Sequence, residues 1–430
     1  MNLFKLALPA LCFLCMACSD DIRTVELSCK SLGDETWLEV EKNETVKICM
    51  DSKVLAWQTS LKSKALNDSC LQIQAPMLIG ASAISVKFHD SGISHKINLV
   101  VGMKFLDFKN EEVLLGFDKK DPKRLAYITG SYLIDKYPVT NCEFTQLMRD
   151  SIPAQTSFKS KPLQEIHAGW LSRKRNDLPK EKCDVHDSAA NTVFLYQAME
   201  YANARSIREG LKPYYLFSES NEKEQRIISK GKYVIGYFDF TNHDKEFIQV
   251  TVDSTSDGYR LPYYDEWMML ARGGDRKNAP WSNYPADEKL KHVLKYALFG
   301  TSKDLYDSSP VGQLLPNGYG LYDMFGLVWE HVLFEERNPF KILKNRPSCL
   351  KGGDNTVILN KDYNNIFHAT IPEWKDIDYG YFKSNYNGGV AAGFRLVRNI
   401  GNNVVWKVTE PQKVRVPRNY EILEWRGTCY

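Results

Sequence analysis

The chain of 430 residues has room for two or more domains, and its apolar content of 43% is ample for a packed core. Its net charge is only +3 and is spread evenly, so no basic tract indicates a nucleic-acid partner. Beyond the N-terminus, no apolar run approaches the length of about eighteen residues that a membrane-spanning helix needs. The composition therefore predicts a globular protein without a nucleic-acid partner or a transmembrane helix.

The N-terminus has the pattern of an export signal. Lys5 precedes a short apolar run over residues 6–16, and a small residue then precedes Cys18. This ending resembles the cleavage site of a bacterial lipoprotein, although Cys15 stands where leucine is usual. We predict a signal peptide at residues 1–18 and a lipid anchor on Cys18 that holds the chain to a membrane of the bacterial cell envelope, on its periplasmic or surface side. Simple cleavage without a lipid is the alternative.

The cysteines of the exported part fit an oxidising compartment. Of ten cysteines, three lie within residues 1–18, so seven remain. Seven is odd, so at least one thiol stays free unless it pairs between chains. The spacing leaves the pairing open. The seven are Cys29, Cys49, Cys70, Cys142, Cys183, Cys349 and Cys429.

Residues 19–105 predict a small all-β sandwich of immunoglobulin-like type. Short runs rich in β-branched residues alternate with Asp, Ser, Gly and Asn, which favour turns between strands. Cys49 and Cys70 lie too close in sequence for the disulfide that usually joins the two sheets of an immunoglobulin domain, so we expect the sandwich without that motif. Residues 106–118 carry both charges and predict a linker. The expected strands are Thr45–Met50, Val54–Gln58, Ala83–Phe88 and Lys96–Val101.

Residues 119–400 predict a second domain in which helices and strands mix. Thr140 and Asn141 are placed to cap a helix over Phe144–Met148, and residues 188–209 have helical apolar spacing. The polar insertion 219–257 contains two strand-like runs, Tyr233–Phe238 and Phe247–Thr251, that predict a hairpin.

Two further features complete this pass along the chain. Pro262 precedes a predicted helix through Trp267–Arg272, in which Glu266 and Arg272 are expected to form a structural ion pair. Residues 401–430 add a strand over Asn403–Val408 and a tail.

The stretch Asn317–His331 combines three glycines with large aromatics and two carboxylates. With so many glycines the stretch has neither helical nor strand periodicity, so a looped backbone held by aromatic side chains is expected. Asp323 and Glu330, with backbone carbonyls between them, offer the hard oxygen donors that Ca²⁺ prefers. The alternative is a core loop whose acids only cap and bridge.

This stretch resembles the NxxGLYDMxGNVWEW signature of the formylglycine-generating-enzyme-like, or sulfatase-modifying-factor, family. Four further segments resemble family motifs in the family's order: residues 127–144, 258–274, 349–354 and 393–398. The resemblance implies an α+β fold of C-type-lectin-like, loop-rich architecture with a mixed sheet over residues 119–400. It also implies bound Ca²⁺, held by the side chains of Asp323 and Glu330 and the carbonyls of Gly326 and Val328.

The family's oxidase chemistry rests on two cysteines, spaced C-x4-C, shortly after its RGGS segment, where they hold copper. In this chain residues 354–365 contain no sulfur, and Asp354 replaces the serine. Copper is therefore not expected. Cys349 and Cys429 are the alternative thiols for an enzyme with an unconventional arrangement.

An aromatic and acidic loop near residue 380 lies where the family has its cleft wall. Aromatic faces beside carboxylates suit a carbohydrate or peptide ligand, and packing within a loop-rich fold is the alternative. The candidate ligand-binding residues are Asp354, Trp374, Asp378, Tyr379 and Tyr381.

Three functions follow as expectations. The first is a lipid-anchored envelope protein whose family domain is non-oxidising and binds or scaffolds a protein or carbohydrate ligand. The second is a formylglycine-generating oxidase that acts on a cysteine of a protein substrate. The third is an accessory protein of a carbohydrate-processing cell surface.

Overall fold

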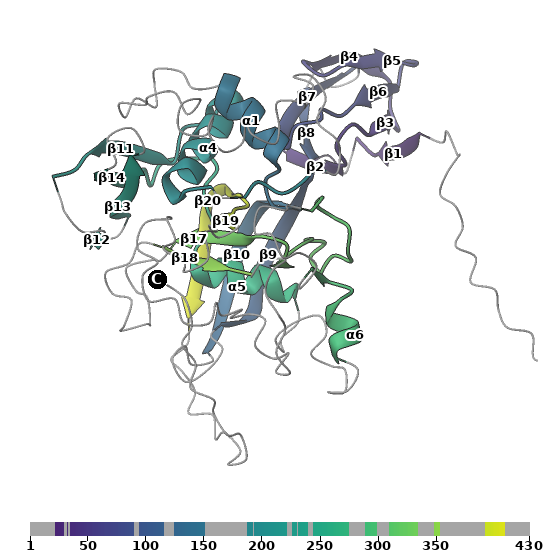
Figure 1. Ribbon diagram of the computed structural model, residues 1–430. Helices are drawn as coiled ribbons and strands as arrows, with labels where there is room; N and C mark the ends of the chain where they lie inside the picture. Colours follow the sequence, from purple (N-terminus) through teal and green to yellow (C-terminus); the bar gives the residue numbers. More distant parts are fainter. Residues whose placement is uncertain are drawn as a thin grey trace, which may run out of the picture.

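The computed structural model contains a small β-sandwich followed by a larger domain in which sheets dominate and helices are few (Figure 1). This agrees with the mixed, loop-rich fold expected from the sequence. The residues that the structure describes are 22–29, 32, 35–89, 94–115, 124–150, 187–191, 193–221, 226–229, 231–239, 244–274, 289–298, 309–333, 348–352 and 392–408.

The β-sandwich consists of two four-stranded sheets, with strand orders β1-β3-β6-β5 and β2-β8-β7-β4. Strand β3 alternates buried and half-buried residues because one of its faces meets the core and the other faces outward. The inward side chains of both sheets form one apolar cluster. The four predicted strands are confirmed, with small extensions. The eight strands are β1 (Arg23–Leu27), β2 (Glu35–Val40), β3 (Thr45–Met50), β4 (Val54–Thr59), β5 (Ser63–Ala65), β6 (Cys70–Gln74), β7 (Gly80–Phe88) and β8 (Ser94–Val101).

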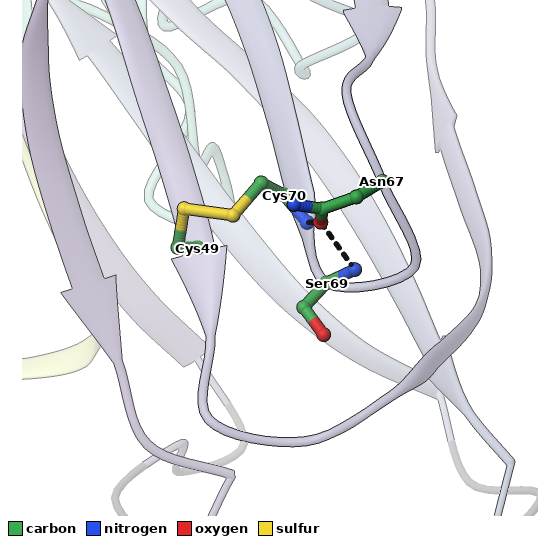
Figure 2. Close-up of a disulfide and its surroundings, with 4 residues drawn as sticks. All are labelled: Cys49, Asn67, Ser69 and Cys70. Carbon is green, nitrogen blue, oxygen red and sulfur yellow. Dashed lines mark hydrogen bonds between the residues drawn. A yellow bond between two sulfur atoms is a disulfide. The ribbon is translucent and has the colours of Figure 1, made fainter.

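A disulfide joins Cys49 and Cys70, which lie directly opposite each other on the neighbouring strands β3 and β6 (Figure 2). It therefore lies within one sheet and does not bridge the two sheets, in agreement with the short spacing. The Asn67 side chain accepts hydrogen bonds from the backbone N–H groups of Ser69, at 2.9 Å, and Cys70, at 2.8 Å, and so shapes the turn into β6.

Two other cysteines have a state that the structure gives. Cys142 is disulfide-bonded. Cys29 is a free thiol among the residues that the structure describes.

The linker predicted at residues 106–118 is wrong over its described part. Residues Met103–Leu115 form strand β9, which pairs along its length with β10 (Arg124–Asp135). Its charged residues are compatible with a strand because β9 is the edge of a three-stranded sheet, β20-β10-β9, whose third member is Val397–Val408. The strand expected at 403–408 is therefore the end of a longer one.

The helices pack against these sheets. Predicted helix 144–148 is α1 (Asn141–Asp150), and the amphipathic segment 188–209 is helical only over α4 (Leu195–Arg208). Helix α5 (Tyr264–Arg272) buries Trp267 against β9 and β10, and it ends at Gly273, which has a φ of 61°. The described residues also contain the short helix α6 (Lys289–Val293).

The predicted hairpin in the polar insertion is confirmed as β13 and β14, which are antiparallel. They belong to a four-stranded sheet, β11-β14-β13-β12, so the insertion is larger than a single hairpin. A two-stranded sheet, β15-β16, and a three-stranded sheet, β18-β17-β19, lie among residues 297–351 and 392–393. The strands are β11 (Tyr215–Glu219), β12 (Arg226–Ser229), β13 (Lys232–Asp239), β14 (Asp244–Val252), β15 (Ala297–Leu298), β16 (Phe325–Gly326), β17 (Trp329–Leu333), β18 (Ser348–Lys351), β19 (Ala392–Gly393) and β20 (Val397–Val408).

The sandwich is packed onto the second domain through buried polar contacts. Lys42, beside β2, forms an ion pair of 2.8 Å with Glu143 of α1, and both side chains are only 2% exposed. Glu143 also closes a capping box, because its carboxylate accepts the Thr140 N–H while the Thr140 hydroxyl accepts the Glu143 N–H. The Trp37 ring stacks on the Phe105 ring, with centroids 5.0 Å apart. No helix among the described residues is long and apolar enough to cross a membrane.

Candidate functional site

The loop that begins at Asn317 is organised by the Asn317 side chain. Its amide oxygen accepts hydrogen bonds from the backbone N–H groups of Tyr319, at 3.0 Å, and Leu321, at 3.2 Å. Its amide nitrogen donates to the Leu270 carbonyl at 2.7 Å and so satisfies a carbonyl at the C-terminal end of α5. One buried asparagine thus fixes the loop and the helix end together.

The next part of the stretch depends on unusual backbone conformations. Asp323 and Leu327 are non-glycine residues with φ of 54° and 63°, and Gly326 between them has a φ of 74°. A Cβ atom at Gly326 would overlap the Leu298 carbonyl oxygen, so only glycine fits where β15 and β16 approach. The expected looped backbone is confirmed, and its turns bring Glu330 into the core.

Glu330 is the centre of a buried polar cluster. Arg395 donates to both carboxylate oxygens, with distances of 2.6 to 3.0 Å, and the Trp267 indole N–H donates at 2.8 Å. Arg395 also donates to the backbone carbonyls of Asp135, at 3.2 Å, and Tyr322, at 2.9 Å. Because the Arg395 and Glu330 side chains are almost fully buried, this network locks three distant segments into one framework.

Two further ion pairs extend this framework. Arg260 forms a bidentate pair with Glu266, at 2.6 and 2.7 Å, so the predicted partner Arg272 is wrong. Arg260 reaches Glu266 from the segment just before α5. Asp135 and Arg205 pair at 2.7 Å with both side chains fully buried. Buried charges of this kind need such pairing and fix the packing of the elements that carry them.

The structure places the four predicted calcium ligands on one stretch but gives Glu330 other partners. Each Glu330 oxygen accepts two hydrogen bonds, which uses the lone pairs that a carboxylate offers. Asp323 accepts the Gly312 N–H at 2.7 Å, and the Gly326 carbonyl accepts the Val328 N–H at 2.8 Å. A calcium ion would therefore require Glu330 to give up one of these contacts, so this arrangement does not fit Glu330 as a ligand. Calcium binding stays a prediction.

Two buried titratable groups have strongly shifted pKa values. Burial lowers the pKa of His331 to about 4, which outweighs its hydrogen bond of 2.7 Å with the Val193 carbonyl. Burial raises the pKa of Glu200 on α4 to about 7. One Glu200 oxygen and the amide nitrogen of Gln197, one turn earlier, have no hydrogen-bond partner in the part of the chain that the structure describes. Sequence reasoning missed Glu200, because a glutamate in an amphipathic helix is usually exposed.

The predicted ligand-binding residues lie outside the described residues, and so does Cys18. They are Asp354, Trp374, Asp378, Tyr379 and Tyr381. The described framework reaches Gly352, just before that segment. The Gly352 carbonyl accepts the Gly326 N–H at 2.8 Å, and a Cβ atom at Gly352 would approach the Trp267 ring to 3.4 Å. Asn317–His331 and Trp267 therefore hold the backbone at the point where the segment with the candidate ligand residues begins.

Comparisons with known proteins give this framework a family. The family model described as "Sulfatase-modifying factor enzyme 1-like domain" matches residues 99–400. The chain is 31% identical over 215 residues to "Chaperone protein LppX" of Paenibacillus barcinonensis, a match that covers 47% of this chain and 61% of the relative.

Two shorter matches carry the enzyme's name. The chain is 40% identical over 79 residues to "Formylglycine-generating enzyme" of Thermomonospora curvata, covering 17% of this chain and 26% of the relative. It is 38% identical over 77 residues to "Inactive C-alpha-formylglycine-generating enzyme 2" of Mus musculus, covering 17% and 25%. The matches thus span less than two thirds of each relative's own length.

The family match begins at residue 99, at the end of β8, and so includes β9, which agrees with the pairing of β9 in the domain's own sheet. It covers more than half of the chain and contains the buried Glu330–Arg395–Trp267 cluster. The chain belongs to the sulfatase-modifying factor enzyme 1-like, or formylglycine-generating-enzyme-like, family.

Proposed function

We propose that this protein is a non-oxidising member of its family that acts by binding, holding a protein ligand or a carbohydrate at the cell envelope. The observation that carries the proposal is the absence of sulfur after the family's glycine pair. Between Cys349 and Cys429 the sequence has no cysteine, so no C-x4-C pair is available to hold copper there. One matched relative is named a chaperone and another an inactive family enzyme, and both names support a binding role.

A titration of the purified protein with Cu(I) under reducing, anaerobic conditions tests the proposal. A thiol count before and after copper addition shows whether cysteines bind the metal. We expect no stoichiometric copper held by two thiolates. One equivalent of Cu(I) bound by two cysteines, and lost in Cys349→Ser, would support the second candidate function, a formylglycine-generating oxidase acting on a protein cysteine, and would overturn the first.

The ligand class is the second part of the proposal. Aromatic faces beside carboxylates at Trp374, Asp378, Tyr379 and Tyr381, with Asp354, suit a carbohydrate or an extended peptide. If carbohydrate is the ligand, as for an accessory protein of a carbohydrate-processing surface, the protein will bind spots of a glycan array. Trp374→Ala will then remove the signal while the unfolding midpoint stays the same. The absence of binding to every glycan on the array would exclude those carbohydrates and favour the extended peptide as the ligand.

Envelope location follows from the N-terminus. Export through residues 1–18 and a lipid on Cys18 would place both domains outside the cytoplasm, where the Cys49–Cys70 disulfide is stable. Labelling of growing cells with a fatty acid will mark the wild-type protein and not the Cys18→Ser variant. An unlabelled wild-type chain in the medium would support cleavage without a lipid.

The finer architecture also belongs to this proposal. The loop-rich family domain suits the C-type-lectin-like arrangement, and the two four-stranded sheets that precede it suit an immunoglobulin-like sandwich. Calcium at Asp323, Gly326, Val328 and Glu330 stays a prediction, and it requires Glu330 to release a hydrogen bond from Arg395 or Trp267. Addition of Ca²⁺ to chelator-treated protein will raise the melting temperature if the site forms. An unchanged melting temperature, with no heat of binding by calorimetry, would mean that Arg395 keeps Glu330 occupied.

A further inference from the structure

The chain that enters α1 runs antiparallel to the segment just before α4. Thr140 and Ala189 form an isolated antiparallel bridge. The Asn141 N–H donates to the Ser188 carbonyl at 2.9 Å, and the Asn141 side-chain amide donates to the Ala189 carbonyl at 2.9 Å. Asn141 and Ser188 are 47 residues apart in the sequence, so this pairing brings two distant stretches of the chain together.

Cys142 continues this pairing. Its N–H, in the first turn of α1, donates to the Asp187 carboxylate at 2.7 Å, and its sulfur is disulfide-bonded. Cys183 lies only four residues before Asp187, outside the described residues. Because four residues span at most about 14 Å, a chain that turns back from Asp187 brings the Cys183 thiol to Cys142.

Cys349 is placed less favourably, because it lies on β18 at the far side of a sheet from this pairing. The sheet has the order β18-β17-β19, so β17 separates Cys349 from β19. The paired segment before α4 meets the sheet at β19, where a Cβ atom at Gly393 would lie 2.4 Å from the Ala190 carbonyl oxygen. Neighbouring strands are about 4.8 Å apart, so β18 lies about 10 Å beyond β19, whereas the Cα atoms of a disulfide lie within about 7 Å of each other.

We propose that Cys142 forms its disulfide with Cys183, which fixes the start of α1 to the chain that leads into α4. Cys49 and Cys70 pair with each other, and Cys29 is a free thiol in the described part of the chain. The competing partner is Cys429 in the tail after β20. Closing the much longer loop from Cys142 to Cys429 costs more chain entropy.

The bond forms by oxidation of two thiols in the export compartment, so the proposal rests on the export that is part of the proposed function. The two protons and two electrons of the thiols pass to a protein disulfide of that compartment, which thiol–disulfide exchange reduces to its dithiol. Of the seven cysteines beyond residue 18, the pairing leaves Cys29, Cys349 and Cys429. Because Cys29 precedes β2 in the sandwich, the alternative oxidase is restricted to Cys349 and Cys429.

Peptide mapping without reduction tests the pairing. The exported protein is purified in detergent, alkylated at acidic pH, digested with trypsin and analysed by mass spectrometry. We expect residues 137–149, which contain Cys142, to be linked to residues 183–205. A link from residues 137–149 to residues 345–351 or 427–430 would overturn the proposal.

The disulfide between Cys49 and Cys70, seen as a link between residues 48–53 and 65–87, separates the pairing from the export on which it rests. If this link is present and the link from Cys142 to Cys183 is absent, the pairing is wrong and the export stands. If both links are absent, the proposal and the export in the proposed function fail together.

Thiol counts under denaturing, non-reducing conditions give an independent check. Cys183→Ser and Cys142→Ser will each add one free thiol per chain, and the double variant will leave the count unchanged. Cys29→Ser is the matched control, because it removes a thiol that is already free and lowers the count by one. A Cys183→Ser chain that gains no thiol would overturn the proposal.

Discussion

Gly326 and Gly401 have nearly the same backbone conformation and opposite surroundings. Their φ angles are 74° and 72°. A Cβ atom would overlap the Leu298 carbonyl at Gly326, whereas at Gly401 it would meet no described atom within 4 Å. If alanine lowers the free energy of unfolding more at Gly326 than at Gly401, the difference therefore measures the close approach of β15 and β16 and not the strain of a positive φ.

We predict that Gly401→Ala costs about 1 kcal/mol, the usual price of a left-handed alanine. Gly326→Ala will cost at least about 3 kcal/mol because the backbone must move as well. Urea unfolding midpoints of both variants measure the difference. Equal losses would mean that the loop around Gly326 relaxes without cost.

The stability of the protein is expected to depend on pH through Glu200, because the carboxyl group of Glu200 is desolvated. Its pKa rises from 4.5 to about 7, so the folded state holds its proton more tightly than the unfolded state. The stabilising contribution is complete below pH 4.5 and is lost as the pH rises through 7. The shift corresponds to roughly 3 kcal/mol.

Glu200→Gln will therefore be more stable than the wild type at pH 8, by up to about 3 kcal/mol, and nearly equal to it at pH 5. Glu26→Gln, at an exposed position on β1, is the control variant and is measured at the same two pH values. Chemical unfolding at both pH values measures this. A difference at Glu200 that is the same at pH 5 and pH 8 would contradict the buried, desolvated carboxyl.

Sequence motifs identified the side chains of the buried framework, but they did not predict which partners those side chains contact. Glu330 and Arg395 both belong to motifs that the sequence shows, yet their pairing links residues 65 positions apart. Glu266 was expected to pair with Arg272 of the same motif, whereas its partner Arg260 lies in the segment before α5. Long-range pairs of this kind depend on how distant segments pack against each other, and the spacing of residues within a motif carries no information about that packing.

At the element scale, the misreading of β9 has a definite cause. Phe108, Val113 and Leu115 are buried, but the pairing with β10 shifts register near Asn110, which has a φ of 58°. This bulge reverses the alternation of inward and outward side chains midway along the strand. The sequence then shows no regular alternation over the whole strand, because the charged residues 107, 109, 111 and 112 interrupt its apolar residues. Regular strands such as β3 and β8 were predictable because no bulge interrupts them.

The ion pair between Lys42 and Glu143 joins two elements that the sequence assigned to separate units. Burial alone would raise the pKa of Glu143, but the charge of Lys42 and the hydrogen bonds from Lys42 and the Thr140 N–H hold it below its usual value. Its contribution to stability is therefore present above pH 4.5 and is lost as the pH falls further.

We predict that Lys42→Met costs roughly 3 to 5 kcal/mol because it leaves a buried carboxylate without its partner. Adding Glu143→Gln will recover part of the loss. Lys96→Met is the control: its pair with Glu35 is 49% and 45% exposed, and such surface pairs contribute about 1 kcal/mol or less. Unfolding midpoints compare the three variants. A small loss for Lys42→Met would mean that the sandwich is only loosely attached.

For the whole molecule, the sandwich and the family domain share packing. One apolar cluster contains Ile79 and Val100 of the sandwich together with Phe144 and Phe394 of the family domain. Arg208 of α4 donates to the Ile79 carbonyl, and Glu209 accepts the Ala81 N–H at 3.2 Å. The sandwich is thus part of the support of the family domain.

The proposed function depends on a family framework that lacks the C-x4-C cysteine pair after its glycines. The most direct measurement is turnover: purified protein, supplied with Cu(I), O₂ and a reductant, is incubated with a cysteine-containing peptide of the kind that the family oxidises, and the peptide is analysed by mass spectrometry. The account predicts that the cysteine is recovered unchanged. Conversion of the cysteine to an aldehyde, with loss of its sulfur and dependence on copper, would contradict it.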